Sequence, residues 1–379
     1  MGGKRNGETE KDRFGFAYPG LLPAACKRAG ETDGAKKPEA VFADNFSCVT
    51  ERGGLFFGNA EKVYFYDSEN DQVYPLCARP NCTHSREEGC LAARIWNPAI
   101  YEDGLYYMRV DENGRQGFYR ADVDGENERK LTEFEYDLPG FLGVFFLNGK
   151  AYMQAGEYSL EGTPESPESV RRSQILLAVD LESGEEKVLD RIECGEDGTA
   201  TWNPVYAGEG RICLNLEAYD LPERSGKVSG SYYLDTEKGE LEPAGLEPDV
   251  TVVCGDGDRE ICYEVADREE NGEEKNGSYW LRTSGSEEME KIGDVKRRTK
   301  AILVDDGVFY DAYEEDYRTG EQRFYRWEDQ TTEIIQQYGG DPESFHVEGR
   351  FWKDGEEMLF GTYAEREEGD GKRDGTRSP

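Results

Sequence analysis

Apolar and aromatic residues recur along the chain in short runs, each interrupted by a glycine-containing turn. One unit reads IYEDGLYYMRV around Gly104, and the next reads VFFLNGKAYMQ around Gly149. Because Asp-Gly and Asn-Gly pairs readily take the positive φ angles of a tight turn, each unit predicts two antiparallel strands joined by a hairpin. The unit is centred on Gly54, Gly104, Gly149, Gly210, Gly257, Gly307 and Gly355.

A second signal follows each of the first six units. Its clearest copy is FYRADVDGENERKL, residues 118–131, in which an aromatic strand leads through an acidic turn to a strand that ends in leucine. An aspartate precedes the turn in four copies, and we interpret it as a turn-capping residue rather than a catalytic one. These aspartates are Asp67, Asp122, Asp180 and Asp235. Two hairpins in every repeat of roughly 50 residues make a four-stranded antiparallel sheet.

A ring of such sheets is a β-propeller, so the predicted fold class is all-β. Six repeats are complete, and the seventh, near Gly355, shows only its first two strands. We favour seven four-stranded blades over six or eight, with the ring closed by an N-terminal strand at Phe14–Tyr18 or Ala40–Phe46. The predicted organisation is an N-terminal segment at 1–39, a single propeller domain at 40–363 and a disordered charged tail at 364–379.

The chain is strongly acidic, and this narrows the choice of partners. Its 379 residues include 45 basic and 81 acidic side chains, which gives a formal net charge of −36. Such an excess repels phosphate backbones, so nucleic acid is not an expected partner. No apolar run reaches the 18 residues of a membrane-spanning helix. We expect membrane association only through a lipid anchor at Cys26, which follows the short apolar run FGFAYPGLLPAA; the alternative is that this run contributes a strand.

The segment PLCARPNCTHSREEGC combines three cysteines with one of the two histidines of the chain. Cys77, Cys82, His84 and Cys90 supply three thiolates and an imidazole, a tetrahedral Zn²⁺ ligand set. Four protein ligands leave no open position for water, so the expected zinc is structural. A disulfide of Cys77 with Cys90 or Cys82, or unpaired thiols, are the alternatives. Dedicated calcium sites are not expected, because the Asp-Gly turns lack the full ligand spacing.

The other cysteines and His346 are interpreted as structural. Two cysteines occupy matching places in the second strands of neighbouring repeats, where a small buried hydrophobe is expected. The remaining three lie in first strands or in a connection between repeats. The matched pair is Cys213 and Cys262. Cys48 and Cys254 lie in first strands, and Cys194 lies in a connection between repeats.

Two stretches carry a resemblance to known proteins. FYRADVDGENERKL resembles the repeat of TolB-type propellers and of a large uncharacterised propeller family of Gram-positive anaerobes. YPLCARPNCTHSREEGCLA is similar to a cysteine–histidine segment near the start of many such proteins. The resemblance spans Val41 to Tyr363 and implies an extracytoplasmic, cell-surface lipoprotein. It implies no activity.

The sequence contains none of the common nucleophile, phosphate-binding, zinc-protease or dinucleotide motifs. We therefore expect a monomeric, non-catalytic binding or scaffold protein that recognises a carbohydrate, peptide or protein. Three long loops, Glu157–Ser173, Tyr219–Ser229 and Arg268–Gly277, are expected on the same face of the ring as the Cys/His segment, either as recognition loops or as tolerated insertions. The alternative is a propeller enzyme of the glycoside hydrolase or lyase type, with paired carboxylates in the central channel.

Overall fold

The computed structural model describes residues 14–17 and, with short breaks, 40–363. The breaks are 44–46, 51–53, 59–61, 68–71, 78–80, 85–89, 94, 124, 138, 141, 164–165, 195–197, 221–224, 269–273, 284–285, 287, 314–319, 339–344 and 354–355. Within these residues the regular elements are antiparallel strands and one short 3₁₀ helix. None of the described helices has the length and apolar character needed to cross a bilayer.

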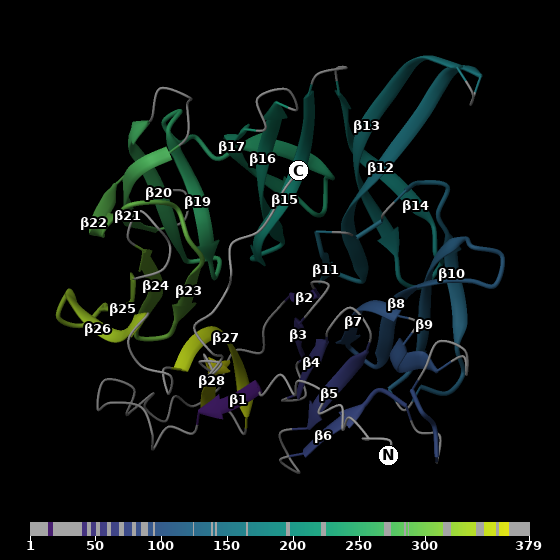
Figure 1. Cartoon of the computed structure of the whole chain (residues 1–379), viewed down its shortest axis with the longest axis horizontal. Helices are drawn as coiled ribbons and strands as arrows, with labels where there is room; N and C mark the ends of the chain where they lie inside the picture. The colour runs from purple at the N-terminus through teal and green to yellow at the C-terminus, as the bar shows by residue number, and fades with distance from the viewer. Residues whose placement is uncertain are drawn as a thin grey trace, which may run out of the picture.

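The described strands form a ring of four-stranded sheets, so the chain is an all-β propeller (Figure 1). The first three blades are β3 (Ser47–Thr50), β4 (Gly54–Gly58), β5 (Val63–Asp67) and β6 (Gln72–Pro75); β7 (Ile95–Tyr101), β8 (Gly104–Val110), β9 (Gln116–Asp122) and β10 (Arg129–Glu133); and β11 (Val144–Leu147), β12 (Lys150–Thr163), β13 (Ser166–Asp180) and β14 (Glu186–Cys194). The next three are β15 (Gly198–Gly208), β16 (Arg211–Asp220), β17 (Ser225–Asp235) and β18 (Glu240–Pro243); β19 (Val250–Gly255), β20 (Arg259–Arg268), β21 (Glu274–Thr283) and β22 (Met289–Val295); and β23 (Ala301–Val304), β24 (Gly307–Tyr313), β25 (Gly320–Arg326) and β26 (Thr331–Tyr338).

The described chain has six four-stranded blades, so the prediction of seven was wrong. After the sixth blade, β27 (Phe345–Lys353) and β28 (Glu356–Tyr363) pair with β1 (Phe14–Ala17) in a three-stranded sheet. β27 contacts β23 on one side and β3 and β4 on the other, so this sheet lies between the sixth and first blades (Figure 1). The predicted N-terminal strand at Phe14 does pair with the C-terminal hairpin, with Phe14 opposite Thr362.

The second segment considered for ring closure has a different partner. β2 (Val41–Ala43) pairs with β11 on one side and β3 on the other, and joins the first and third blades into one nine-stranded sheet. Val41 and Ala43 are buried, and the ring of Phe42 lies 4.5 Å from that of Phe145. These apolar contacts hold β2 against the inner strand of the third blade, so it is not available to the last sheet.

The hairpin turns form where the glycine pattern predicts them. Asn148 and Gly149 join β11 to β12 with φ angles of 51° and 70°, and Glu209 and Gly210 join β15 to β16 with 51° and 72°. Consecutive left-handed residues match the right-handed twist of a strand pair, which is why short hairpins select them. In a later turn, Asp180 caps the chain as predicted, because its Oδ1 accepts hydrogen bonds from the backbone of Glu182 and Ser183.

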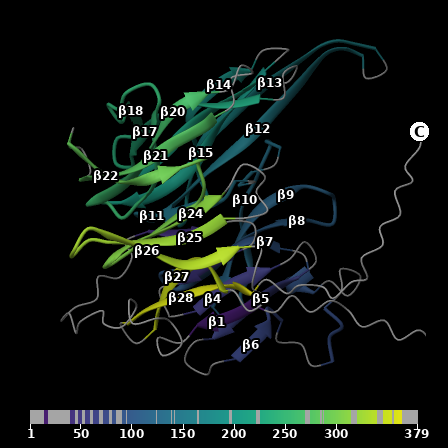
Figure 2. The ribbon, with the colours of Figure 1, turned by 60° about the vertical axis from the view of Figure 1, so that its left-hand side comes forward.

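The three predicted long loops are instead largely paired strands. Tyr219 and Asp220 pair with Gly226 and Ser225, Arg268 pairs with Glu274, and Glu157–Ser173 belongs to a long hairpin. β12 and β13 stay paired from Lys150 and Asp180 outward to Thr163 and Ser166. β14 accompanies β13 only as far as Arg172, so the outer part of the pair is a two-stranded ribbon that extends beyond its blade (Figure 2). The Glu, Ser and Pro residues of this segment favour a loop in the prediction. The segment can still form strands, because hydrogen bonds between the backbones of adjacent strands do not require apolar side chains.

Candidate metal centre

The predicted ligand segment connects the outer strand of the first blade to the inner strand of the second. Its first ligand, Cys77, comes two residues after β6 ends, and the backbone N–H of Leu76 donates to the carbonyl of Val63 at 3.1 Å. This bond extends the pairing with β5 by one residue and fixes the direction in which the chain leaves the blade. Cys77 is half-buried, and together with Leu76 it packs against a small apolar cluster around Cys90.

Cys82 and His84 follow the turn residue Asn81. Asn81 and His84 have φ angles of 60° and 56°, in the left-handed region that non-glycine residues rarely occupy. The backbone N–H of His84 points at Sγ of Cys82 at 3.4 Å. An amide donor on a sulfur favours the thiolate, which is the form that binds metals. This hydrogen bond holds the second and third predicted ligands close together.

Cys90 is the buried member of the group. It precedes the 3₁₀ helix η2 (Leu91–Ala93), in which Ala92 and Ala93 are also buried, and its carbonyl accepts the N–H of Ala93. Its Sγ lies 3.5 Å from Nδ1 of His84. Burial, followed by a hydrogen bond with Cys77, raises the pKa of the Cys90 thiol. The site is thus anchored at one end in the packed junction between two blades.

The four ligand atoms gather as a metal site requires. The thiol sulfurs of Cys77, Cys82 and Cys90 and a ring nitrogen of His84 all lie within 4.8 Å of one another. Around a tetrahedral zinc, bond lengths of about 2.3 Å to sulfur and 2.0 Å to nitrogen separate a sulfur from a nitrogen by about 3.5 Å. The observed 3.5 Å between Cys90 Sγ and His84 Nδ1 agrees with that separation. The donor set fits Zn²⁺ with four protein ligands.

The other cysteines whose side chains the structure describes lie outside this centre. Cys213 and Cys262 are fully buried, as predicted, and Cys254 is half-buried. Cys194 ends β14, where its Sγ accepts the N–H of Ala200 at 3.4 Å. Cys26 lies outside the described residues, and so do the side chains of Cys48 and His346.

A buried polar cluster between the fourth and fifth blades was missed by the sequence analysis. Glu260 and Arg282 form an ion pair with side chains 0% and 3% exposed. The hydroxyls of Tyr206 and Tyr233 both donate to Glu260 Oε1. The two tyrosines come from β15 and β17 and the ion pair from β20 and β21, so the cluster ties two blades together. The signal in the sequence was weak, because Glu260 and Arg282 are 22 positions apart among many other charged residues.

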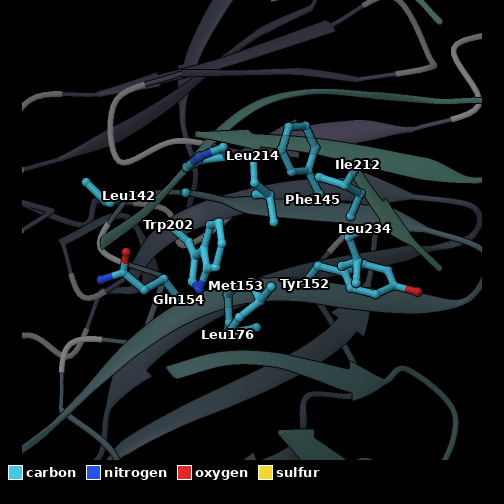
Figure 3. A pocket seen from close by; sticks show the side chains of 12 residues that line it. Leu142, Phe145, Tyr152, Met153, Gln154, Leu176, Trp202, Ile212, Leu214 and Leu234 are labelled. Carbon is cyan, nitrogen blue, oxygen red and sulfur yellow. The ribbon is translucent and has the colours of Figure 1, made fainter. Parts of the chain in front are cut away.

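A small pocket lies between the third and fourth blades (Figure 3). Apolar side chains such as Phe145, Trp202 and Leu214 line it, together with the amide of Gln154. It has room for about one water molecule. No carboxylate is among its lining residues, so it does not provide the paired acids that the enzyme alternative requires.

Comparison with known proteins finds similarity at the level of fold. No protein-family model and no curated protein matches the chain. Among solved structures, TolB from Acinetobacter baumannii is 11% identical, with 79% of this chain and 65% of that chain covered and a TM-score of 0.37. The propeller domain of the Trilobed protease from Pyrococcus furiosus is 15% identical, with 88% and 89% covered and a TM-score of 0.46.

A puromycin-hydrolyzing peptidase from Mycobacterium tuberculosis is 12% identical, with 85% of this chain and 49% of that chain covered and a TM-score of 0.45. The present chain thus spans about half the length of that peptidase and about two thirds of the length of the A. baumannii TolB. Its structural neighbours are TolB-like β-propellers.

Proposed function

We propose that this chain is a non-catalytic propeller scaffold in which a structural Zn²⁺ fastens the connection between the first two blades. Cys77, Cys82, His84 and Cys90 hold the ion. The observation that carries the proposal is the convergence of their ligand atoms within 4.8 Å. The proposal includes an extracytoplasmic location and recognition of a carbohydrate, peptide or protein on the face of the ring that carries this connection.

The metal would order a long connection between blades. Cys77 and Cys90 are separated by 12 residues, of which 78–80 and 85–89 are not described. A loop of this length without a core of its own needs a cross-link to stay fixed. Ligation by four side chains supplies one, because metal-binding free energy is also free energy of ordering. The bound ion would polarise no substrate, since no coordination position remains open.

Metal analysis of the purified full-length chain tests the proposal. We expect one zinc per chain, lost on prolonged chelation, and thiolate-to-metal absorption bands after replacement with Co²⁺. Cys90→Ser should abolish stoichiometric zinc, whereas Cys194→Ser, at a half-buried cysteine outside the cluster, should retain it. Folding of both variants is compared by circular dichroism, so that a loss of metal is separated from a loss of structure.

The disulfide alternative has a distinct signature in the same samples. For this test the protein is purified without reductant. The metal proposal is refuted if the protein carries no zinc and two of the three cluster cysteines do not react with an alkylating reagent. The enzyme alternative places paired carboxylates in the central channel, and the pocket between the third and fourth blades, which lacks carboxylates, does not supply them.

A further inference from the structure

The short strand β2 lies near the centre of the ring (Figure 1). It contacts β3, β7, β11 and β15, which are the first strands of the first four blades. Its pairing with β11 sets Ala43 opposite Val144 and Phe42 opposite Phe145, while Ala43 also pairs with Cys48 of β3. Partners on both edges are what an extended peptide has when it is added to a sheet. The space that β2 fills between these four strands is called the β2 site below.

The side chains of β2 alternate between two apolar cores. Val41 and Ala43 are 2% and 0% exposed and belong to the core of the first three blades. Phe42 instead packs against the core between the third and fourth blades. Gly143 makes room for its ring, because a Cβ at this position would lie 2.5 Å from Cε2 and Cζ of Phe42. The β2 site therefore accommodates an aromatic side chain between two smaller apolar ones.

Two observations show that β2 complements this site incompletely. Nδ2 of Asn97, a fully buried residue of β7, donates to the carbonyl of Ala43 at 3.0 Å, but Oδ1 of the same amide is buried without a hydrogen-bond partner among the described residues. An unpaired buried acceptor costs free energy, so Asn97 favours a ligand that also offers an N–H donor. In addition, Gly143 and Phe145, which lie against the Phe42 ring, line the small pocket between the third and fourth blades. Unfilled space thus adjoins the aromatic position.

One end of the β2 site lies at the face of the ring that carries the Cys/His connection. The connections between blades lead into the beginning of each first strand, and β11 begins at Val144, the partner of Ala43. The Ala43 end of β2 is therefore at that face, which is the face of the proposed recognition. Because β2 pairs with three of the four residues of β11, a longer peptide can add a pair at Leu147.

We propose that the β2 site binds an extended peptide and that β2 is its internal occupant, which such a peptide displaces. The peptide carries an aromatic residue between smaller apolar residues. Pairing with β3 and β11 at once requires a polypeptide backbone, which sets the class of ligand. The proposal rests on the binding function put forward above and selects a peptide as what is recognised. A strand attached to the chain competes at an effective concentration in the millimolar range, so β2 weakens binding in the natural protein.

The experiment measures binding of the fluorescein-labelled peptide PEAVFADN, residues 38–45, to the full-length protein by fluorescence anisotropy. The test variant is Val41→Asp, because a carboxylate in this buried position disfavours docking of β2. The matched control is Val188→Asp, at a valine of β14 that is 40% exposed. We expect the test variant to bind the peptide at least about tenfold more tightly than the control, since β2 no longer competes. The reference peptide PEAVAADN, without the aromatic ring, should bind about tenfold more weakly than PEAVFADN.

Two further measurements separate binding at the β2 site from other effects. Circular dichroism verifies the folding of each variant, and Phe42→Ala replaces Val41→Asp if the latter does not fold, because it loosens β2 by removing a half-buried ring. A benzophenone at the aromatic position of the peptide should cross-link to residues of β11, which mass spectrometry locates.

Absence of peptide binding by the folded test variant at about 1 mM, a very weak affinity, overturns the proposal, and β2 is then a fixed part of the ring. Equal affinities of the test and control variants, equal affinities of the two peptides, or cross-links only outside the β2 site overturn it as well. Zinc content is measured on the same samples, so a failure of the β2 site is distinguished from a failure of the metal centre.

Discussion

Glu260 and Arg282 face each other across β20 and β21 as a buried ion pair, with Arg282 Nε donating to Glu260 Oε2 at 2.9 Å. Both hydroxyls that donate to Glu260 come from the neighbouring blade, on Tyr206 and Tyr233. The two tyrosines thus connect the fourth blade to an ion pair of the fifth that water does not reach.

Replacing Glu260 with Gln leaves the Arg282 charge buried without its counter-ion. Breaking a buried pair in this way costs about 3–5 kcal/mol, so the free energy of unfolding should fall by that amount. Urea denaturation at neutral pH measures the change. Glu240→Gln is the matched control, because Glu240 is exposed on β18. Equal stability of the two variants would show that the cluster does not hold the blades together.

Asp180 makes the stability of the third blade depend on pH. Hydrogen bonds from the backbone and hydroxyl of Ser183 and from the backbone of Glu182 lower the pKa of Asp180. A carboxyl group whose pKa is lower in the folded chain than in the unfolded chain stabilises the fold. This stabilisation is complete at pH values above the unfolded-state pKa of about 3.9, and it is lost as the pH falls through the folded-state pKa.

The variant Asp180→Ala should lose about 1 kcal/mol of stability at pH 7. At pH values below the folded-state pKa, the difference from the natural chain should shrink. Urea denaturation between neutral and acidic pH tests this, with Glu182→Gln in the same turn as the control. A difference that stays constant across the range would contradict the assignment of Asp180 as an ionised cap.

Cys262 should be inert toward alkylation in the folded protein. Burial raises the pKa of its thiol to about 12, and the side chain is fully buried. Because the thiolate is the reactive form, iodoacetamide at pH 8 should modify the half-buried Cys194 first and leave Cys262 unmodified until the chain unfolds. Peptide mass spectrometry after timed quenching gives both rates. Comparable rates in the native protein would refute the buried environment.

The strand β1 should stabilise the C-terminal hairpin. Phe14, Gly15, Phe16 and Ala17 pair with residues 359–362 of β28. Removing residues 1–17 deletes these pairs, whereas removing residues 1–13 preserves them. We expect the longer deletion to expose the segment 345–363 to limited proteolysis and the shorter one to leave its cleavage rate unchanged. If both deletions behave alike, β1 contributes nothing to the last sheet.

Local features of the fold could be predicted from the sequence. The turns at Gly149 and Gly210 depend on two residues each, and the predicted metal ligands lie within a single segment, so both can be recognised from local spacing. The ligand atoms of Cys77, Cys82, His84 and Cys90 lie within 4.8 Å of one another.

Non-local features could not be predicted. The three residues of β2 pair with β11, about 100 positions away, and nothing in Val41–Ala43 encodes that partner. For the same reason the blade count was wrong: a seventh four-stranded blade needed two N-terminal strands, and one of the candidates packs elsewhere. The register that sets Glu260 opposite Arg282 also becomes visible only once the strands are paired.

The pairing of β1 with β28 bears on how this chain could be anchored. Lipidation at Cys26 requires cleavage just before that residue, and the released peptide would include all of Phe14–Ala17. A mature chain that begins with a lipid-bearing Cys26 would therefore have only β27 and β28 between its sixth and first blades. A chain anchored through a lipid on Cys26 therefore lacks β1 and cannot form the three-stranded sheet of β1, β27 and β28. The N-terminal residue of the mature protein shows whether the molecule has the anchor or the complete sheet.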